Sequence, residues 1–280
     1  MKISANKVKK SIVTICFIPV IIVMAFPLYM LVINSFKTLR EFYANPLALP
    51  NSFKYIDNFK YVLEKQDYFK LLGNNVIILG GALLLLVFTG AMAGFVLGRS
   101  RSKVMRILYS VVVLGITLPT YKMLIPQVKI IVALHLKNTY TGMILYYVAS
   151  GMPMAIFLFN GFFSSAPRDL EEAAKLDGCS LYRTFFQIFF PLSVATIATL
   201  VLIQSIGIWN DTTMPVLLLR REKRTLMPTL QDFYGRMMGQ GTRWERIYAD
   251  AVLCMIPMIL VFFLSNRYLI KGVSEGALKG

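Results

Sequence analysis

The chain has 280 residues, of which 56% are hydrophobic and only 16% are charged, whereas about a quarter of the residues of a soluble domain are charged. Its 30 lysines and arginines against 14 acidic residues give a net charge of +16. These basic residues flank long uncharged stretches and form no basic stripe, which favours a membrane protein over a nucleic-acid-binding one. The three cysteines lie far apart and the one histidine, His135, has no metal-ligand spacing to them, so the sequence predicts neither a disulfide framework nor a metal site.

Six stretches of the chain are candidates for membrane spans, since about 20 apolar residues cross the hydrocarbon of a bilayer. The first is too long for a signal-peptide core, and no small-residue cleavage site follows it. The third is short, but Arg106 and Lys122 at its ends can snorkel to the membrane surface. We predict an all-α membrane protein with six transmembrane helices, at residues 12–32, 71–98, 107–121, 138–167, 184–210 and about 248–266.

The basic residues also predict the orientation of the chain, because lysine and arginine near span ends favour the cytoplasmic side. Six spans place both termini on the same side of the membrane. Basic residues crowd the first ten positions and the short second loop, while residues 37–70 and 211–247 are longer and carry most of the acids. We therefore expect both termini to be cytoplasmic; the basic residues in question are Lys2, Lys7, Lys9, Lys10, Arg99, Arg101, Lys103 and Arg106.

Several energy-coupling features are missing from the sequence. No aspartate or glutamate lies in the central part of a predicted span, so no buried carboxylate relay is expected. No Gly-Lys dipeptide occurs, which excludes a phosphate-binding P-loop. No repeat resembles a channel selectivity filter. If this protein moves a solute uphill, the energy must come from another subunit.

The loop between the fourth and fifth spans reads SSAPRDLEEAAKLDGCSLYRTFFQIFFPLS and predicts two short helices joined at Gly178, which can adopt a left-handed C-cap. Ser165 or Ala166 is expected to precede the first helix, with Pro167 at its first position. Ser180 is expected to cap the second helix.

The first of these helices has a distinctive composition. Its early acidic residues complement the helix dipole. Spacings of three and four predict one shared face, which two alanines keep shallow enough for a partner to approach closely. On physical grounds alone, a plain surface hairpin and a docking element both remain open. The early acids are Asp169, Glu171 and Glu172, and the shared face comprises Leu170, Ala173, Ala174 and Asp177.

The same loop resembles the EAA signature of binding-protein-dependent ABC transporter permeases. Glu172-Ala173-Ala174 is followed by Gly178, Ile188 and Pro191 at the spacing of that signature, with Phe190 where it has leucine. Three further segments resemble the carbohydrate branch, the maltose-type and multiple-sugar permeases of the MetI-like type I importers. They are MPMAIFLFNGFF before the loop, WND after the fifth span and NRYLIKGVSEGALKG at the end.

The resemblance implies an organisation and a set of partners. It implies an N-terminal cytoplasmic segment, first span and outer loop at 1–72, a permease core at 73–267 and a cytoplasmic tail at 268–280. The partners would be two ATPase subunits, a second and non-identical permease, and an extracytoplasmic solute-binding protein, in a bacterial or archaeal cytoplasmic membrane. The chain itself would be no enzyme and bind no cofactor, since its partners use ATP and Mg²⁺. Coupling to the ATPase would involve Glu171, Glu172, Ala173, Ala174, Asp177, Gly178 and Pro191.

Candidate solute contacts are polar or aromatic residues in or at the end of spans. An indole can pack against the C–H faces of a sugar, while amides and carboxylates hydrogen-bond its hydroxyls. Tryptophan is also enriched at membrane interfaces and aspartate often caps the next helix, and the polar residues within spans often bond only to other helices. The candidates are Trp209, Asn210, Asp211, Asn160, Tyr147 and Gln204.

The leading functional hypothesis is the membrane-spanning subunit of an ATP-driven importer of a sugar or oligosaccharide. The same core could serve an amino acid, a polyamine or another solute. An intramembrane enzyme would need clustered acids, metal ligands or an activated nucleophile, whereas the cytoplasmic acids here lie in one loop. A passive channel is disfavoured by that loop. The basic cluster Arg220–Arg224 suits either a solvated outer loop or an acidic partner.

Overall fold

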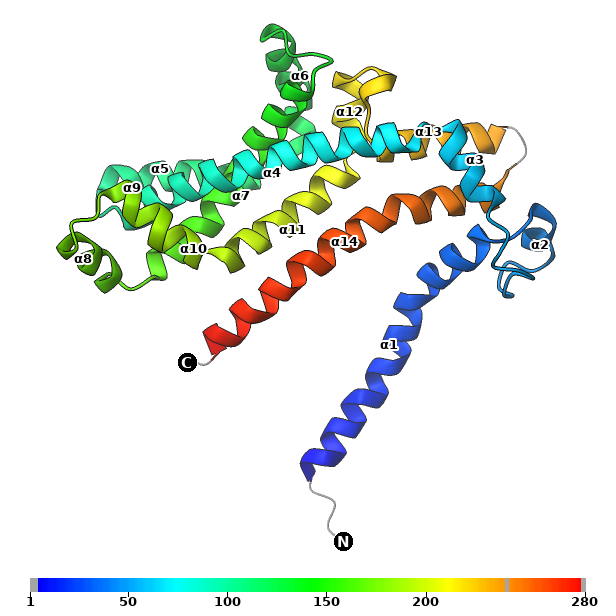
Figure 1. Ribbon diagram of the computed structural model, residues 1–280, viewed down its shortest axis with the longest axis horizontal. Helices are drawn as coiled ribbons and strands as arrows, with labels where there is room; N and C mark the ends of the chain where they lie inside the picture. The colour runs from blue at the N-terminus through cyan, green and yellow to red at the C-terminus, as the bar shows by residue number, and fades with distance from the viewer. Residues whose placement is uncertain (1–4, 240–241, 278–280) are drawn as a thin grey trace. The chain divides into compact units, whose positions relative to one another are not determined.

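The computed structural model of the chain describes residues 5–239 and 242–277, without the side chains of residues 5–16, 120–121, 267 and 269–277. Lys2 and the last three residues of the expected tail lie outside the described residues. All regular elements in the described part of the chain are helical, which confirms the predicted all-α class. Figure 1 shows the long helices and the short ones that connect them.

Four helices are long and apolar enough to cross a membrane. They coincide with the first, second, fourth and sixth predicted spans, since a long apolar stretch can satisfy its backbone hydrogen bonds internally by forming a helix. The four are Phe17–Ser35 within α1 (Ala5–Ser35), α4 (Tyr68–Arg99), α7 (Tyr140–Ser165) and Trp244–Asn266 within α14 (Trp244–Ala277).

The third predicted span is not a single long helix. Helix α5 (Lys103–Leu114) has 12 residues and continues as a short 3₁₀ turn, η1 (Gly115–Thr117). Leu118 is then extended, with φ −72° and ψ 125°, because the ring of Pro119 disfavours helical backbone in the residue before it. A second 3₁₀ turn, η2 (Thr120–Met123), leads into α6 (Leu124–Ala133).

The fifth predicted span is broken. Its first part contains a π-helix, η3 (Phe185–Phe189), and meets the second part at an angle of 70°. Pro191 has no N–H to donate to the turn before it, which weakens the helix at this point, and the chain then bends at Ser193. The parts are α9 (Leu181–Thr184), η3 and α10 (Phe190–Leu192), then α11 (Val194–Asn210).

The chain divides into two compact units, and residues 229–256 belong to the same unit as the N-terminal segment. Unit 1 comprises 1–68 and 229–256, and unit 2 comprises 69–228 and 257–280. Unit 1 holds α1, α2 (Leu39–Ala44), α3 (Asp57–Lys65), most of α13 (Leu226–Gly239) and the start of α14. Unit 2 holds the elements from α4 to α12 (Thr213–Leu218) and η4 (Arg221–Lys223).

Unit 1 has a small core and contains two buried carboxylates, those of Glu245 and Asp250. Val62, Phe233, Met237 and Ala249 form the core. The carboxylate of Asp250 is buried and accepts a hydrogen bond from the amide of Gln66 at 2.6 Å. Asp250 lies just inside the predicted sixth span, near its N-terminal end. Its buried partner explains how a charged residue is accommodated at this depth.

Unit 2 is built on a close approach between α4 and α7. Gly90, Gly94 and Gly98 recur every four residues along α4 and so lie on one face. A Cβ at Gly94 would lie 2.6 Å from the Cβ of Phe159 on α7. Small residues at this spacing let two membrane helices pack closely.

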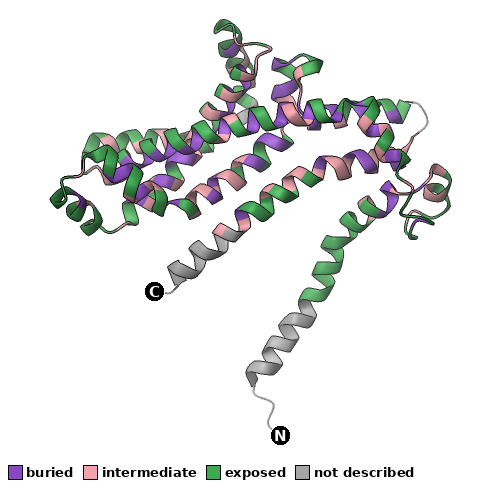
Figure 2. Cartoon of the chain, viewed as in Figure 1, coloured by how far each residue is buried: buried purple, intermediate pink, exposed green. Residues whose placement is uncertain are grey.

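A cluster of buried aromatic and aliphatic side chains fills the space between α4, α7, η3 and α11, and buried residues follow one side of these helices in Figure 2. The described part of α1 is mostly exposed in the single chain. The cluster comprises Leu86, Val87, Ala91, Phe95, Ala155, Phe159, Phe163, Phe185, Phe189 and Leu200.

Candidate functional site

The loop after α7 contains the two predicted helices, α8 (Asp169–Leu176) and α9 (Leu181–Thr184). Between them Gly178 has φ +71°, the predicted left-handed conformation. The Cys179 N–H donates to the carbonyl of Ala174 at 2.9 Å and closes the turn. The Ser180 hydroxyl accepts from the N–H of Arg183, which confirms the predicted cap.

The start of the first helix differs from the prediction. Helix α8 begins at Asp169, so Pro167 is not its first residue. Ser165 belongs to α7 and Ala166 is extended, with ψ 140°. The reason is again steric: Pro167 excludes helical backbone at the residue before it. This extended residue ends α7 and separates it from α8.

The predicted common face of α8 is also wrong in part. Ala174 is only 2% exposed and is buried within unit 2, whereas Leu170, Ala173 and Asp177 are exposed. Successive helical residues are about 100° apart, so the two alanines diverge. The outer side of the loop also carries large apolar side chains: Leu176 is 89% and Tyr182 is 70% exposed.

Glu171 does not face outward, because it pairs with Arg99, a basic residue whose position in the sequence predicted only the orientation of the chain. Arg99, the last residue of α4, donates from Nε to Oε2 of Glu171 at 2.9 Å. The exposed Lys175 approaches the other carboxylate oxygen at 3.2 Å. Burial alone would raise the pKa of Glu171, but the hydrogen bonds from Arg99 and Lys175 prevail and hold this pKa below its ordinary value.

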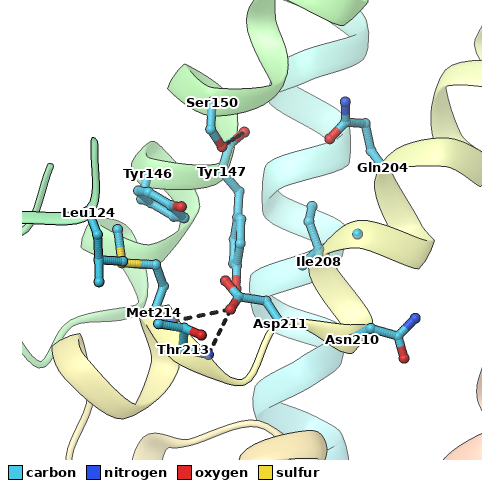
Figure 3. A pocket seen from close by; sticks show the side chains of 11 residues that line it. Leu124, Tyr146, Tyr147, Ser150, Gln204, Ile208, Asn210, Asp211, Thr213 and Met214 are labelled. Atoms are coloured by element: carbon cyan, nitrogen blue, oxygen red, sulfur yellow. Dashed lines mark hydrogen bonds between the residues drawn. The ribbon is translucent and has the colours of Figure 1, made fainter. Parts of the chain in front are cut away.

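A separate cavity of about 390 Å³ lies between α7, α11 and α12 (Figure 3). Its lining combines hydroxyl, amide, carboxylate and apolar groups. Asp211 is the one charged residue among them. Such a set can hydrogen-bond the hydroxyls of a neutral polyol and pack against its C–H groups. The lining residues are Leu124, Tyr146, Tyr147, Ser150, Gln204, Gly207, Ile208, Asn210, Asp211, Thr213 and Met214.

Asp211 organises one wall of this cavity. Its Oδ2 accepts a hydrogen bond from the hydroxyl of Tyr147 at 3.0 Å. Its Oδ1 accepts from the backbone N–H groups of Thr213 at 2.8 Å and Met214 at 3.2 Å (Figure 3). Asp211 therefore caps the first turn of α12, which is the alternative to solute contact that the sequence left open. It also borders the cavity.

The structure brings four of the six candidate solute residues together and leaves two elsewhere. Tyr147, Gln204, Asn210 and Asp211 line the cavity. Trp209 is only 2% exposed and is not part of the lining. Asn160 lies nearer the end of α7 that leads into the loop around Gly178, where its side chain accepts a hydrogen bond from Ser164.

Ser150, Thr213 and Leu124 are lining residues that the sequence analysis did not propose. Ser150 could have been found, since it lies one helical turn beyond Tyr146 and Tyr147. Leu124 could not have been predicted as a lining residue, because its place beside the cavity depends on the break between α5 and α6, which the sequence did not predict. Within the described residues, no group of three or more metal-ligating side chains could hold a metal ion.

The chain is similar to known membrane transport proteins. Residues 87–275 match the family described as "Binding-protein-dependent transport system inner membrane component". The chain is 30% identical to the melibiose/raffinose/stachyose import permease protein MelC of Bacillus subtilis (strain 168), over 91% of each chain. It is 29% identical to the probable starch degradation products transport system permease protein AmyC of Thermoanaerobacterium thermosulfurigenes, over 97% of this chain and 98% of that one.

A solved structure shares the fold. It is the crystal structure of a bacterial ABC transporter involved in the import of the acidic polysaccharide alginate. The matching chain is 17% identical, with a TM-score of 0.79, and the match covers 96% of this chain and 99% of that one.

Proposed function

Because the chain belongs to the family of binding-protein-dependent transport system inner membrane components, we propose that it is the membrane-spanning permease subunit of an ATP-driven importer of a sugar or oligosaccharide. The observation that carries this proposal is the likeness to MelC and AmyC over more than nine-tenths of the chain. Both relatives bear names that refer to sugars or starch products. As a transport subunit, the chain is not an enzyme.

The cavity beside Asp211 is the proposed place where the solute passes. Its hydroxyl and amide groups suit sugar hydroxyls, and Tyr146 offers an aromatic surface. No lysine or arginine is among its eleven lining residues, which favours a neutral sugar over an acidic one at this point in the path.

The loop around Gly178 is the proposed contact with the ATPase subunits. Glu172 and Ala173 are exposed on it, as are Leu176, Leu181 and Tyr182. Large apolar side chains that are this exposed beside charged residues favour a protein partner.

The full assembly has two ATPase subunits, which use ATP and Mg²⁺, a second permease chain and an extracytoplasmic solute-binding protein. Co-purification from the native membrane with a tag on this chain, followed by mass spectrometry, tests this composition.

A six-span topology with cytoplasmic termini completes the proposal. The four long helices and the bent pair supply five crossings, and α5 with η1 supplies the remaining one. The basic residues at the end of α4 and the start of α5 then face the cytoplasm.

The topology predicts a labelling pattern. In a cysteine-free background, a cysteine at Lys60 or Arg236 should react with an impermeant maleimide in intact cells, whereas one at Lys103 should react only after lysis. All three positions are exposed on the chain, so access depends on the side of the membrane. Labelling of Lys103→Cys in intact cells, with protection of the other two, would invert the orientation.

Gln204 and Trp209 should respond differently to truncation. Gln204→Ala removes a polar group of the cavity lining and should weaken apparent sugar affinity by roughly tenfold, since one or two lost hydrogen bonds cost about 1–3 kcal/mol. Trp209→Ala removes a buried indole and should lower the amount of folded protein, because such truncations cost about 3–5 kcal/mol.

Uptake kinetics and size-exclusion profiles of the two variants separate these effects. A Gln204→Ala variant with unchanged affinity would place the solute path outside this cavity. A Trp209→Ala variant that folds normally but has lost sugar affinity would indicate that the indole contacts the sugar directly.

A further inference from the structure

Arg99 connects four elements of unit 2 at the cytoplasmic end of α4. Its side chain is only 8% exposed. Nε donates to Glu171 on α8 at 2.9 Å. Nη1 donates to two backbone carbonyls near the end of α7, Phe163 at 3.2 Å and Ala166 at 2.8 Å. Phe163 lies in the last turn of α7 and Ala166 directly follows the helix, so neither carbonyl has an intrahelical donor.

The fourth element is the π-helix. The guanidinium carbon of Arg99 lies 5.1 Å from the ring centre of Phe189, close enough for a cation–π interaction. Phe189 is fully buried in the aromatic cluster of unit 2. It lies in η3, just before the 70° bend that leads into α11. Rare π-helical turns often occur at functional sites.

Helix α8 has few other attachments to the rest of the unit. Of its eight residues, all described, only Ala174 is buried. The Arg99–Glu171 pair is therefore the charged contact that sets the position of this helix. Charge-assisted hydrogen bonds to a buried guanidinium are stronger than neutral ones and fix orientation as well as distance.

A continuous path thus runs from the exposed loop to the cavity. Non-covalent contacts connect Glu171 to Arg99 and Arg99 to Phe189, and the chain then continues through α10 and the bend into α11, which carries Gln204. The part of α11 from its first residue, Val194, to Gln204 covers about 15 Å at 1.5 Å per residue. A stiff helix over this distance can carry a displacement of the bend to the cavity wall.

We propose that Arg99 is the positioning residue that couples the loop around Gly178 to the bent helix lining the cavity, so that displacement of α8 by an ATPase partner moves α11. This inference rests on the proposed function. It assigns no contact with solute or nucleotide to Arg99.

A double-mutant cycle tests the proposal in the complete transporter, reconstituted in liposomes with its ATPase subunits, partner permease and binding protein. The readout is sugar transported per ATP hydrolysed, together with the yield of assembled complex. Arg99→Gln and Glu171→Gln should each lower this ratio by at least about tenfold while the complex still assembles. The double variant should be no worse than either single one, because both remove the same link.

Two further variants make the test specific. Lys175→Ala removes the exposed partner of Glu171 and should change the ratio less than about twofold, since exposed ion pairs contribute little. Arg99→Lys keeps the charge but loses the forked donors, and should restore only part of the coupling. If Arg99→Gln does not assemble, Glu171→Gln alone decides, because it retains the side-chain volume and leaves Arg99 in place.

A normal ratio in Glu171→Gln, or strictly additive losses in the double variant, would overturn the proposal. The wild-type complex in the same assay separates this result from failure of the proposed function. If the wild type shows no ATP-dependent sugar uptake, the proposed function falls and the inference falls with it. If the wild type transports and the variants stay coupled, only the role of Arg99 is refuted.

Discussion

Replacing Gly178 with valine should uncouple ATP hydrolysis from sugar uptake while leaving the protein in the membrane. Gly178 has φ +71°, and no atom lies within 4 Å of where a Cβ would be. The penalty is therefore purely one of backbone conformation, roughly 1–2 kcal/mol for an L-residue in the left-handed region and more for a β-branched one. The turn between α8 and α9 should open, and the exposed surface of the loop should lose its shape.

The measurement is ATPase activity and uptake by the same reconstituted complex. We expect hydrolysis to persist while uptake falls at least about tenfold. Gly178→Asn is the matched control, because asparagine tolerates the left-handed conformation, and it should retain most of the uptake. Normal uptake by Gly178→Val would count against any role of this turn in coupling.

Replacing Gly94 with leucine should prevent unit 2 from packing. A Cβ at this position would lie 2.6 Å from the Cβ of Phe159 and 2.9 Å from the backbone nitrogen of Asn160. Backbone atoms cannot move aside as a flexible side chain can, so α4 and α7 must separate. Overpacking of this kind costs about 1–3 kcal/mol, and more when whole helices are displaced.

Thermal unfolding of the purified chain, followed by fluorescence-detected size exclusion, measures this effect. We expect Gly94→Leu to lower the melting temperature by at least about 5 °C or to give only aggregate. Gly80→Leu on the same helix is the control, since no atom lies within 4 Å of its Cβ position. Equal stability of the two variants would contradict the close approach of α4 and α7 at Gly94.

The sequence was sufficient to predict the long helices, because each is a long, mostly apolar run with few or no charged residues. It also predicted the turn at Gly178 and the cap at Ser180, since both depend on local backbone chemistry. It did not predict the breaks in the third and fifth apolar stretches. Pro119 and Pro191 were visible there, but hydropathy measures the length of a stretch and not whether its helix is straight.

The candidate site was predictable only where residues are near one another in the chain. Asn210 and Asp211 were found as neighbours, but the contact between Asp211 and Tyr147 joins residues 64 positions apart. Arg99 and Glu171 are 72 positions apart, and nothing in the local pattern pairs them. The four-residue spacing of Gly90, Gly94 and Gly98 was a signal for helix contact that hydropathy alone does not use.

The most direct measurement of the central claim is uptake of labelled malto-oligosaccharides and raffinose by liposomes containing the co-purified complex, its binding protein and internal Mg-ATP. We predict that at least one sugar accumulates against its gradient with ATP, and none accumulates without ATP or with this chain alone. Accumulation of an amino acid or a polyamine and of no sugar would contradict the sugar assignment. ATP hydrolysis by the isolated chain would contradict its role as a permease subunit.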